Sequence, residues 1–280
     1  MSTSGPIKID VASVLASRLG KRARLIPRFL VRGVEKLICQ DDLNALLEHN
    51  YPLRGAAFCR GVMKEMNIRL DVCNADRMPA DPRVVVVSNH PLGGLDGIAM
   101  IAWLSERYPD KPVHFIVNDL LMAVEPLRDC FVPVNKHGAQ NRDYARQLDE
   151  VLAGDGPVVI YPAGLVSRLH DDGRIADLNW RKMAVMKALE SRRDIVPVHF
   201  DGQNSMSFYR WARRRVAAGI RFNYEMMLLP RELVRSRNKT FTLTVGHVVP
   251  WQSLAGRHPV VAAQELRSTV YSLVKRDSIS

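Results

Sequence analysis

No apolar run in the sequence approaches the ~20 residues that a membrane-spanning helix needs. The N-terminal segment also lacks the pattern of a signal peptide, because basic residues between Arg18 and Arg28 interrupt its apolar stretches. Cysteine is scarce, and the four cysteines form neither a CxxC pair nor a Cys/His cluster with the spacing of a zinc site. We therefore expect a cytosolic protein with reduced thiols, no metal and no cofactor.

Several catalytic signatures are missing as well. The sequence has no G-x-S-x-G turn for a nucleophilic serine, no P-loop and no G-x-G-x-x-G dinucleotide turn. Acidic residues are too few to balance the basic ones, since 29 Asp and Glu stand against 40 Lys and Arg, a net charge of +11. Such an excess favours an anionic partner: nucleic acid, an anionic membrane surface or a phosphorylated substrate. No zinc knuckle, RNA-recognition aromatic motif or clear helix-turn-helix is present, so we expect no nucleic-acid partner.

The hydrophobic pattern changes near residue 67. Before it, apolar residues recur at helical spacing; after it, alternating or β-branched strands alternate with helices. We expect an α/β fold with a largely parallel mixed sheet flanked by helices over 67–280, preceded by an N-terminal helical, membrane-contacting lobe over 1–66. The predicted strands cover 68–72, 84–87, 113–117, 131–134, 158–161, 195–200 and 241–245; the predicted helices of this domain cover 98–106, 120–127, 142–152, 181–191, most of 205–233, and 260–274.

Ligands of open α/β sheets bind beyond the carboxyl ends of the strands. The valine strand Val84–Val87 ends in a polar, glycine-rich turn that contains His90 and Asp96. A carboxylate bonded to one imidazole nitrogen fixes the tautomer, so that the other nitrogen can take a proton from a hydroxyl. The alternative is structural: Asp96 caps the next helix and His90 satisfies the loop backbone.

Two other strand exits carry polar residues. The turn 134–138 contains Lys136, and the turn 161–168 contains Gly164, Ser167 and Arg168. Backbone N–H groups and a guanidinium fork in the second turn suit an anionic group. The alternative for both is an ordinary surface loop.

Four segments, in this order, resemble the blocks of the glycerophospholipid acyltransferase family, which includes 1-acylglycerol-3-phosphate acyltransferases. They are Asn89-His90 with Asp96, Phe131–Lys136, Tyr161–Gly164 and Ile195–Val198. The form of the first block, together with 203–210 and 225–230, is most similar to a hemolysin-like bacterial branch related to the acyltransferases that complete ornithine and glycine aminolipids. The resemblance covers roughly 70–250.

The resemblance implies an O-acyltransferase in which His90 is the general base on an acceptor hydroxyl and Asp96 orients it. The hydroxyl attacks an acyl thioester carried on acyl carrier protein or coenzyme A. By the same resemblance, Lys136 and Arg168 bind the anionic head group of a lysolipid acceptor, and an anionic membrane surface is a partner. The implied location is peripheral, at the cytoplasmic face of the inner membrane. The remaining expected substrate-binding residues of these blocks are Asn89, Gly93, Gly94, Gly164 and Ser167.

Two departures from the family pattern matter. Five residues separate His90 from Asp96 where the family usually has four, so we expect a bulge at Gly93-Gly94. Ala163 and Leu165 stand where the family or the related branch has Glu, so we expect no carboxylate to brace this turn. We therefore predict a carboxylate-bearing lyso-aminolipid as the acceptor rather than lysophosphatidic acid. A basic nucleic-acid- or membrane-binding protein without catalysis is the alternative to an enzyme.

Two basic helical segments, 18–32 and 208–215, remain to be explained. The second combines arginines with Phe208, Tyr209 and Trp211. Each segment either lies at an anionic bilayer or is a solvated face whose apolar side packs on the core.

Overall fold

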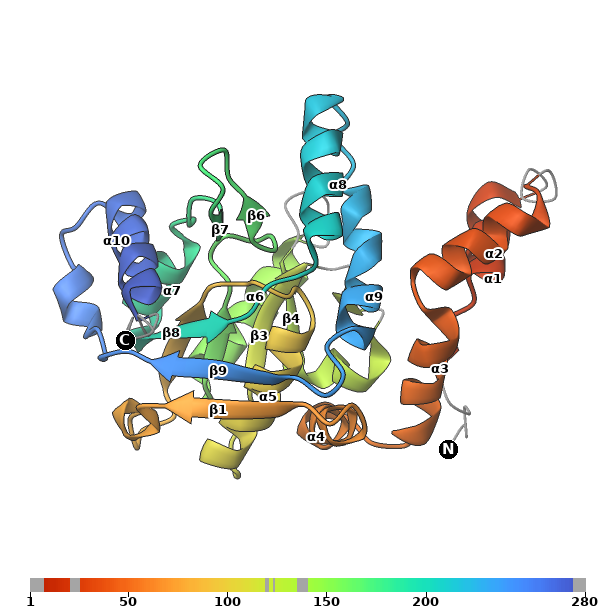
Figure 1. Ribbon diagram of the computed structural model, residues 1–280. Helices are drawn as coiled ribbons and strands as arrows, with labels where there is room; N and C mark the ends of the chain where they lie inside the picture. Colours follow the sequence, from red (N-terminus) through yellow and green to blue (C-terminus); the bar gives the residue numbers. More distant parts are fainter. Residues whose placement is uncertain (1–7, 21–25, 119–120, 123, 135–140, 274–280) are drawn as a thin grey trace, which may run out of the picture.

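The computed structural model describes residues 8–20, 26–118, 121–122, 124–134 and 141–273. Its centre is a seven-stranded sheet with the order β1-β9-β8-β2-β5-β3-β4 (Figure 1). Neighbouring strands are parallel except β8 and β9, which are antiparallel. The predicted largely parallel mixed sheet is therefore confirmed. Its strands are β1 (Arg69–Cys73), β2 (Val84–Ser88), β3 (His114–Asn118), β4 (Phe131–Val134), β5 (Val158–Ile160), β8 (Asp194–Asp201) and β9 (Thr240–Val245).

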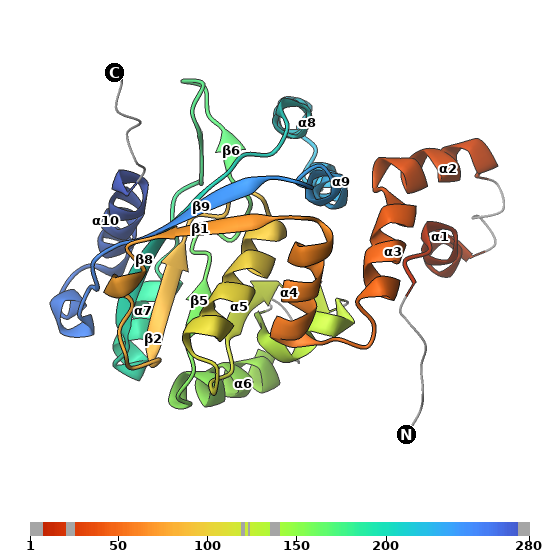
Figure 2. The ribbon, with the colours of Figure 1, turned by 60° about the horizontal axis from the view of Figure 1, so that its bottom comes forward.

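Helices cover both faces of this sheet (Figure 2). Helices α4 (Gly55–Glu65) and α5 (Leu95–Arg107) pack on one face; α6 (Asn141–Ala153), α7 (Met183–Ser191) and α10 (Pro259–Ser272) pack on the other. Strand β2 lies in the middle, and its side chains alternate between the two cores, Val84 and Val86 in one, Val85 and Val87 in the other. A run of β-branched residues fits this strand because both of its faces are buried.

Three helices precede this core and lie beside it as an arm, α1 (Val11–Leu19), α2 (Arg28–Leu37) and α3 (Gln40–His49) (Figures 1 and 2). The carboxylate of Asp10 caps α1 by accepting the N–H of Ser13 at 3.0 Å. Helix α4 contributes Phe58 and Val62 to the core that it shares with α5, and α3 adds Leu46 to the same core. The predicted division after residue 66 would thus separate α4 from a core that it helps to form.

A smaller layer lies beyond the ends of the central strands. It consists of the hairpin β6 (Arg168–Leu169) and β7 (Ile175–Ala176), helix α8 (Met206–Ala217), the 3₁₀ helix η5 (Tyr224–Leu228) and α9 (Leu229–Val234). Val166, Phe208, Tyr209 and Leu228 form its apolar centre. This layer covers the edge of the sheet where the polar turns of the sequence emerge.

Two expectations about local structure need correction. Instead of a helix over 120–127, the described part of this segment contains a 3₁₀ helix η4 (Glu125–Cys130) with Pro126 in its first turn, where a missing N–H costs nothing; residues 119–120 and 123 lie outside the described residues. The hairpin β6–β7 was not predicted, because strands of two residues show no alternation. Two further short 3₁₀ helices of the described residues are η2 (Ala75–Arg77) and η6 (Trp251–Leu254).

Candidate active site

His90 and Asp96 are in contact at the exit of β2. The His90 Nδ1 lies 2.9 Å from Asp96 Oδ2, and the carboxylate, on the first turn of α5, is fully buried. Asp96 also accepts the backbone N–H groups of Leu92 at 3.0 Å and Gly97 at 2.9 Å. It therefore holds the turn together and faces the imidazole at once. The contact expected from the sequence is formed, while the catalytic roles of the pair stay predictions.

The extra residue between His90 and Asp96 is accommodated at one glycine. Gly93 has φ +77°, a conformation that strains any residue with a Cβ, whereas Gly94 has φ −153°. A Cβ on Gly93 would lie only 2.5 Å from Val166 Cγ2. The expected bulge thus occurs at Gly93 and packs against the turn that follows β5.

Burial and neighbouring carboxylates act in opposite directions on His90. Burial lowers the pKa of His90, but the charge and hydrogen bond of Asp96 and the charge of Asp177 outweigh it, so that the pKa is raised. Burial raises the pKa of Asp96, but the charge of His90 and the hydrogen bonds that Asp96 accepts outweigh burial, so that the pKa is lowered. An ionised carboxylate only accepts hydrogen bonds, so Nδ1 donates to Asp96 and Nε2 of the neutral ring keeps its lone pair.

The His90 ring is also fixed from the side of β5. It stacks on Tyr161, with ring centroids 4.0 Å apart and an interplanar angle of 20°. Burial, then the charges of Asp96 and Asp177, raise the pKa of the Tyr161 phenol well above its ordinary value, so it stays protonated. Its hydroxyl has no hydrogen-bond partner among the residues that the structure describes. The ring therefore orients His90, and the hydroxyl remains available for a partner.

Asp177 joins the His90 turn to the third block. Its Oδ1 accepts the backbone N–H of His90 at 3.2 Å and the Ser167 hydroxyl at 2.6 Å; its Oδ2 accepts Trp180 Nε1–H at 2.9 Å. The hairpin β6–β7 brings Ser167 and Asp177 together, because Arg168 pairs with Ala176 and these two residues lie directly before and after that pair. The Ser167 N–H donates to the His90 carbonyl at 2.9 Å. Fully buried Asp177 is thus a central support of the site.

Arg168 is braced by a carboxylate from a distant segment. Its guanidinium donates to Glu225 Oε1 at 2.9 Å and to the Val166 carbonyl at 3.1 Å, and lies over the Phe208 ring. Arg215 Nε lies 2.9 Å from the other oxygen of Glu225, which is fully buried. The expectation that no carboxylate supports this turn is wrong: Glu225 and Asp177 take the place of the glutamate that the block itself lacks.

The structure places the other predicted site residues as follows. Asn89 is buried and binds the backbone N–H and carbonyl of Phe200, at 2.8 and 2.9 Å, so it ties the end of β2 to β8. Gly94 is exposed at the start of α5, and Gly164 has φ +67° in the turn after β5. Contact of these residues, Ser167 and Arg168 with substrate stays a prediction. Lys136 lies outside the described residues.

Sequence reasoning missed Asp177, Glu225 and Tyr161. Asp177 follows a short segment without periodicity, and its only signal was an acidic residue just before Trp180. Glu225 heads a stretch that was noticed for its resemblance, and the signal for its role was the carboxylate missing from the turn of Arg168. Tyr161 was assigned to a strand, although a ring at a strand exit beside His90 was a candidate for stacking.

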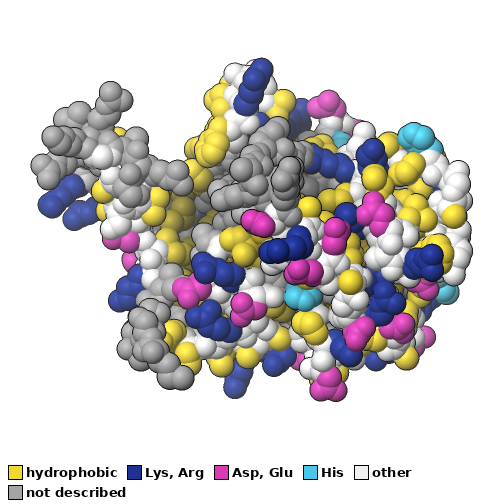
Figure 3. Space-filling view, turned by 180° about the vertical axis from the view of Figure 1, so that it is seen from behind, with side chains coloured by type: hydrophobic (Ala, Val, Ile, Leu, Met, Phe, Trp, Pro, Cys, Tyr) yellow, Lys and Arg dark blue, Asp and Glu magenta, His cyan; other side chains and the backbone are white. Residues whose placement is uncertain are grey.

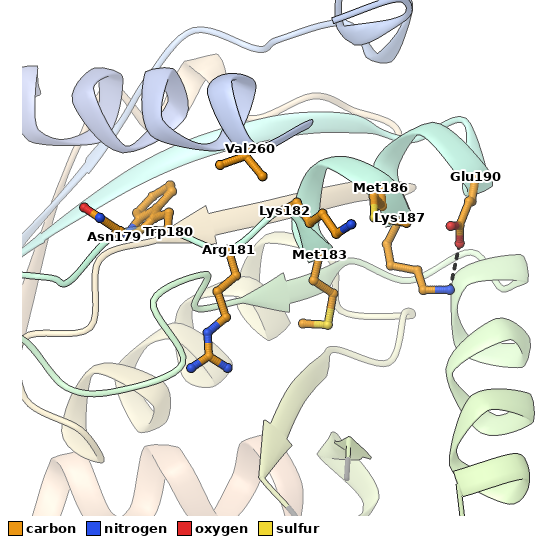
Figure 4. A pocket seen from close by; sticks show the side chains of 9 residues that line it. All are labelled: Asn179, Trp180, Arg181, Lys182, Met183, Met186, Lys187, Glu190 and Val260. Carbon is orange, nitrogen blue, oxygen red and sulfur yellow. Dashed lines mark hydrogen bonds and ion pairs between the residues drawn. The ribbon is translucent and has the colours of Figure 1, made fainter. Parts of the chain in front are cut away.

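A shallow depression of about 630 Å³ lies between α7 and α10, beside this region (Figure 4). Met183, Met186 and Val260 line it together with Arg181 and Lys182. Arg181 also reaches the third block, since a Cβ on Gly164 would lie 3.7 Å from its guanidinium. Within the described ranges no cluster of His, Cys, Asp and Glu suits a metal ion, and no helix is long and apolar enough to cross a membrane.

Known proteins are similar to this chain over most of its length. The acyltransferase family model matches residues 13–276. The chain belongs to this acyltransferase family. Two curated relatives, each named lyso-glycine lipid O-acyltransferase, come from Phocaeicola vulgatus and Bacteroides thetaiotaomicron; the chain is 38% and 36% identical to them over 266 residues, 95% of this chain and 95% and 97% of theirs.

The enzyme is thus an O-acyltransferase, and the resemblance of the sequence to the acyltransferase family is confirmed. The alternative of a basic binding protein without catalysis receives no support from these relatives. Among solved structures, the 1-acyl-sn-glycerophosphate acyltransferase of Thermotoga maritima is similar at 15% identity and a TM-score of 0.47, over 89% of this chain and 93% of that one.

Proposed function

We propose that the enzyme transfers a fatty acyl group from an acyl thioester to the hydroxyl of a lysolipid, in phospholipid or aminolipid biosynthesis. The observation that carries the proposal is the contact of 2.9 Å between His90 Nδ1 and the buried Asp96 carboxylate. It leaves Nε2 as the base at the strand exit. The two relatives, 38% and 36% identical to this chain, are named as lyso-glycine lipid O-acyltransferases, which supports a lysolipid acceptor.

In the proposed reaction, His90 Nε2 takes the proton of the acceptor hydroxyl while its oxygen attacks the thioester carbon. Asp96 stabilises the imidazolium that forms and does not itself take the proton. The tetrahedral intermediate then expels the thiolate as the C–S bond breaks, and the imidazolium returns its proton to that sulfur. Because one group accepts and then donates the same proton, a pKa near neutrality suits both halves of the reaction.

For the acceptor we propose a carboxylate-bearing lyso-aminolipid, such as the lyso-glycine lipid of the relatives. Arg168 and Arg215 share the single carboxylate of Glu225, so this cluster carries only one uncompensated positive charge. A head group with one carboxylate matches that charge better than a phosphomonoester, which carries nearly two negative charges. The donor is a thioester of acyl carrier protein or coenzyme A, and no further cofactor takes part.

We further propose that the enzyme works as a peripheral protein at the cytoplasmic face of the inner membrane. The net charge of +11 supports attraction to an anionic lipid surface.

The test is steady-state kinetics of the purified chain with lyso-glycine lipid and with lysophosphatidic acid of the same acyl chain. Each acceptor is combined with acyl-carrier-protein and coenzyme A thioesters of one chain length, and mass spectrometry follows the diacyl product. We expect a higher kcat/KM for the lyso-aminolipid. A preference for lysophosphatidic acid contradicts the proposed acceptor, and no product from any pair contradicts the proposed function.

A further inference from the structure

Helix α8 buries one face near its base and leaves apolar side chains exposed toward its far end. Phe208, Tyr209 and Ala212 are buried, at the spacing of one helical face. Trp211, at the flank of this face, is 42% exposed, and Val216, further along the same face near the end of the helix, is 65% exposed; in the loop beyond the helix, Ile220 is 44% and Phe222 is 71% exposed. We call Trp211, Val216, Ile220 and Phe222 the α8 tip. In Figure 3 the projecting helix carries yellow side chains on its flanks and dark blue ones at its end.

The loop of the α8 tip is fixed by its own hydrogen bonds. Gly219, at φ +67°, ends the helix: its N–H donates to Val216, and the N–H of Ile220 donates to Arg215. This arrangement usually buries the residue after the glycine against the last turn of the helix. Here that turn presents Arg215, whose guanidinium donates to the Ile220 carbonyl at 2.9 Å. The loop thus holds Ile220 and Phe222 outward instead of folding them in.

Cations surround the α8 tip. Four arginines are exposed there: Arg210, Arg213, Arg214 and Arg221. Among the described residues, one ion pair involves these arginines, between Arg213 and the exposed Asp171 at 3.4 Å. Aromatic and aliphatic side chains ringed by arginines suit the interface of a bilayer, where the rings enter the head-group layer and the guanidinium groups meet lipid phosphates. The same charge opposes a second copy of this chain, because two tips would bring like charges together.

The base of α8 is attached to the candidate active site. The Asn204 side chain donates to the carbonyl of Pro91, next to His90, and its backbone N–H donates to the Tyr209 hydroxyl. Twelve residues of α helix span about 18 Å. The helix is therefore a short rigid rod between the catalytic turn and the exposed loop.

We infer that the α8 tip inserts into an anionic lipid bilayer and holds His90 at a set height above it. This inference rests on the proposed function, since a lysolipid acceptor supplies the reason for working at a bilayer. It assigns the insertion to the α8 tip, a surface separate from the basic N-terminal arm.

The experiment measures partition of the full-length chain into vesicles of phosphatidylcholine alone or mixed with phosphatidylglycerol. Phe222→Asp is compared with Val261→Asp, the same kind of change at a residue that is 53% exposed on α10, away from α8 (Figures 1 and 2). We expect Phe222→Asp to lower partition into the anionic vesicles by about tenfold or more. Val261→Asp stays within about twofold of the wild type, since a residue outside the contact contributes little.

A second readout uses the chain's own tryptophan. Brominated lipids quench Trp211 in the wild-type chain if the α8 tip inserts, and Trp211→Phe removes that quenching. Equal partition of Phe222→Asp and wild type, or wild-type binding to neither vesicle, overturns the inference. A change of oligomeric state without a change in partition assigns the surface to a second copy and also overturns it. The vesicles contain neither lysolipid nor thioester, so a failure of acyl transfer leaves this result intact.

Discussion

The guanidinium of Arg168 donates a hydrogen bond of 2.9 Å to Glu225, and these two buried residues lie 57 positions apart in the chain. The other oxygen of Glu225 lies 2.9 Å from Arg215 Nε. One carboxylate thus holds two arginines from two elements, the hairpin after β5 and helix α8. Arg168 is fixed in place before any head group arrives.

Glu225→Gln keeps the size of this side chain and removes its charge. Because two arginines then lose their shared counter-ion in a buried position, we expect the free energy of unfolding to fall by about 3 kcal/mol. Urea denaturation of the full chain measures the loss. Asp171→Asn is the control, because Asp171 pairs with Arg213 at the surface and its loss leaves the midpoint unchanged. Equal midpoints for wild type and Glu225→Gln would contradict the role of Glu225.

His90→Ala tests the proposed base. We expect kcat to fall by ~10²–10⁴-fold with the fold intact, as for loss of a general base. The matched control is His49→Ala, which should leave kcat unchanged. The Nδ1 of His49 also lies 2.9 Å from a carboxylate oxygen, that of Glu65, but this pair is at the surface between α3 and α4. Circular dichroism checks the fold of both variants. Near-normal turnover in a folded His90→Ala enzyme would contradict the assignment of His90 as the general base.

Asp177→Asn tests the support beneath His90 through the pH dependence of kcat/KM. The base must be neutral, and its raised pKa places the acid limb of the wild-type profile above the ordinary value of about 6.5. Removing the Asp177 charge lowers the pKa of His90, so the limb moves to lower pH. Trp180→Phe removes a hydrogen bond to Asp177 without changing charge and leaves the limb in place. Identical limbs in wild type and Asp177→Asn would mean that Asp177 only maintains the fold.

Tyr161→Phe concerns the buried hydroxyl beside His90. A buried hydroxyl without a partner costs about 1–3 kcal/mol, so its removal should raise the free energy of unfolding by roughly 1 kcal/mol. Tyr271→Phe is the control with the opposite sign, because the Tyr271 hydroxyl accepts the N–H of Asp177 at 2.7 Å. Thermal unfolding of both variants decides. A less stable Tyr161→Phe protein would show that the hydroxyl has a partner in the folded chain.

The sequence was most informative where a pattern has one physical cause. The valine run predicts a strand buried on both faces, and the polar turn after it predicts the edge where His90 and Asp96 meet. Both depend on residues within ten positions of each other, so local periodicity and strand-exit geometry suffice.

The two carboxylates that support the site, Glu225 and Asp177, could not be predicted from local sequence patterns. Glu225 faces Arg168 only because α8 projects beyond the sheet and η5 returns along it, a path that no local period encodes. Asp177 meets Ser167 through the register of a hairpin with two residues in each strand. Such short elements form because the surrounding layers hold them, and therefore leave little trace in the sequence.

The order of the sheet has a consequence for how the chain folds during synthesis. Strand β1 lies at the edge and pairs with β9, whose residues Thr240–Val245 follow it by about 170 positions. Strands β2, β3, β4, β5 and β8 can pair among themselves before β9 leaves the ribosome. Strand β1 must wait for nearly the whole chain, and long-range pairing of this kind is slow. Addition of β1 to the sheet is thus a late step. In a ribosome-stalled chain that ends before residue 240, β1 should remain accessible to proteases.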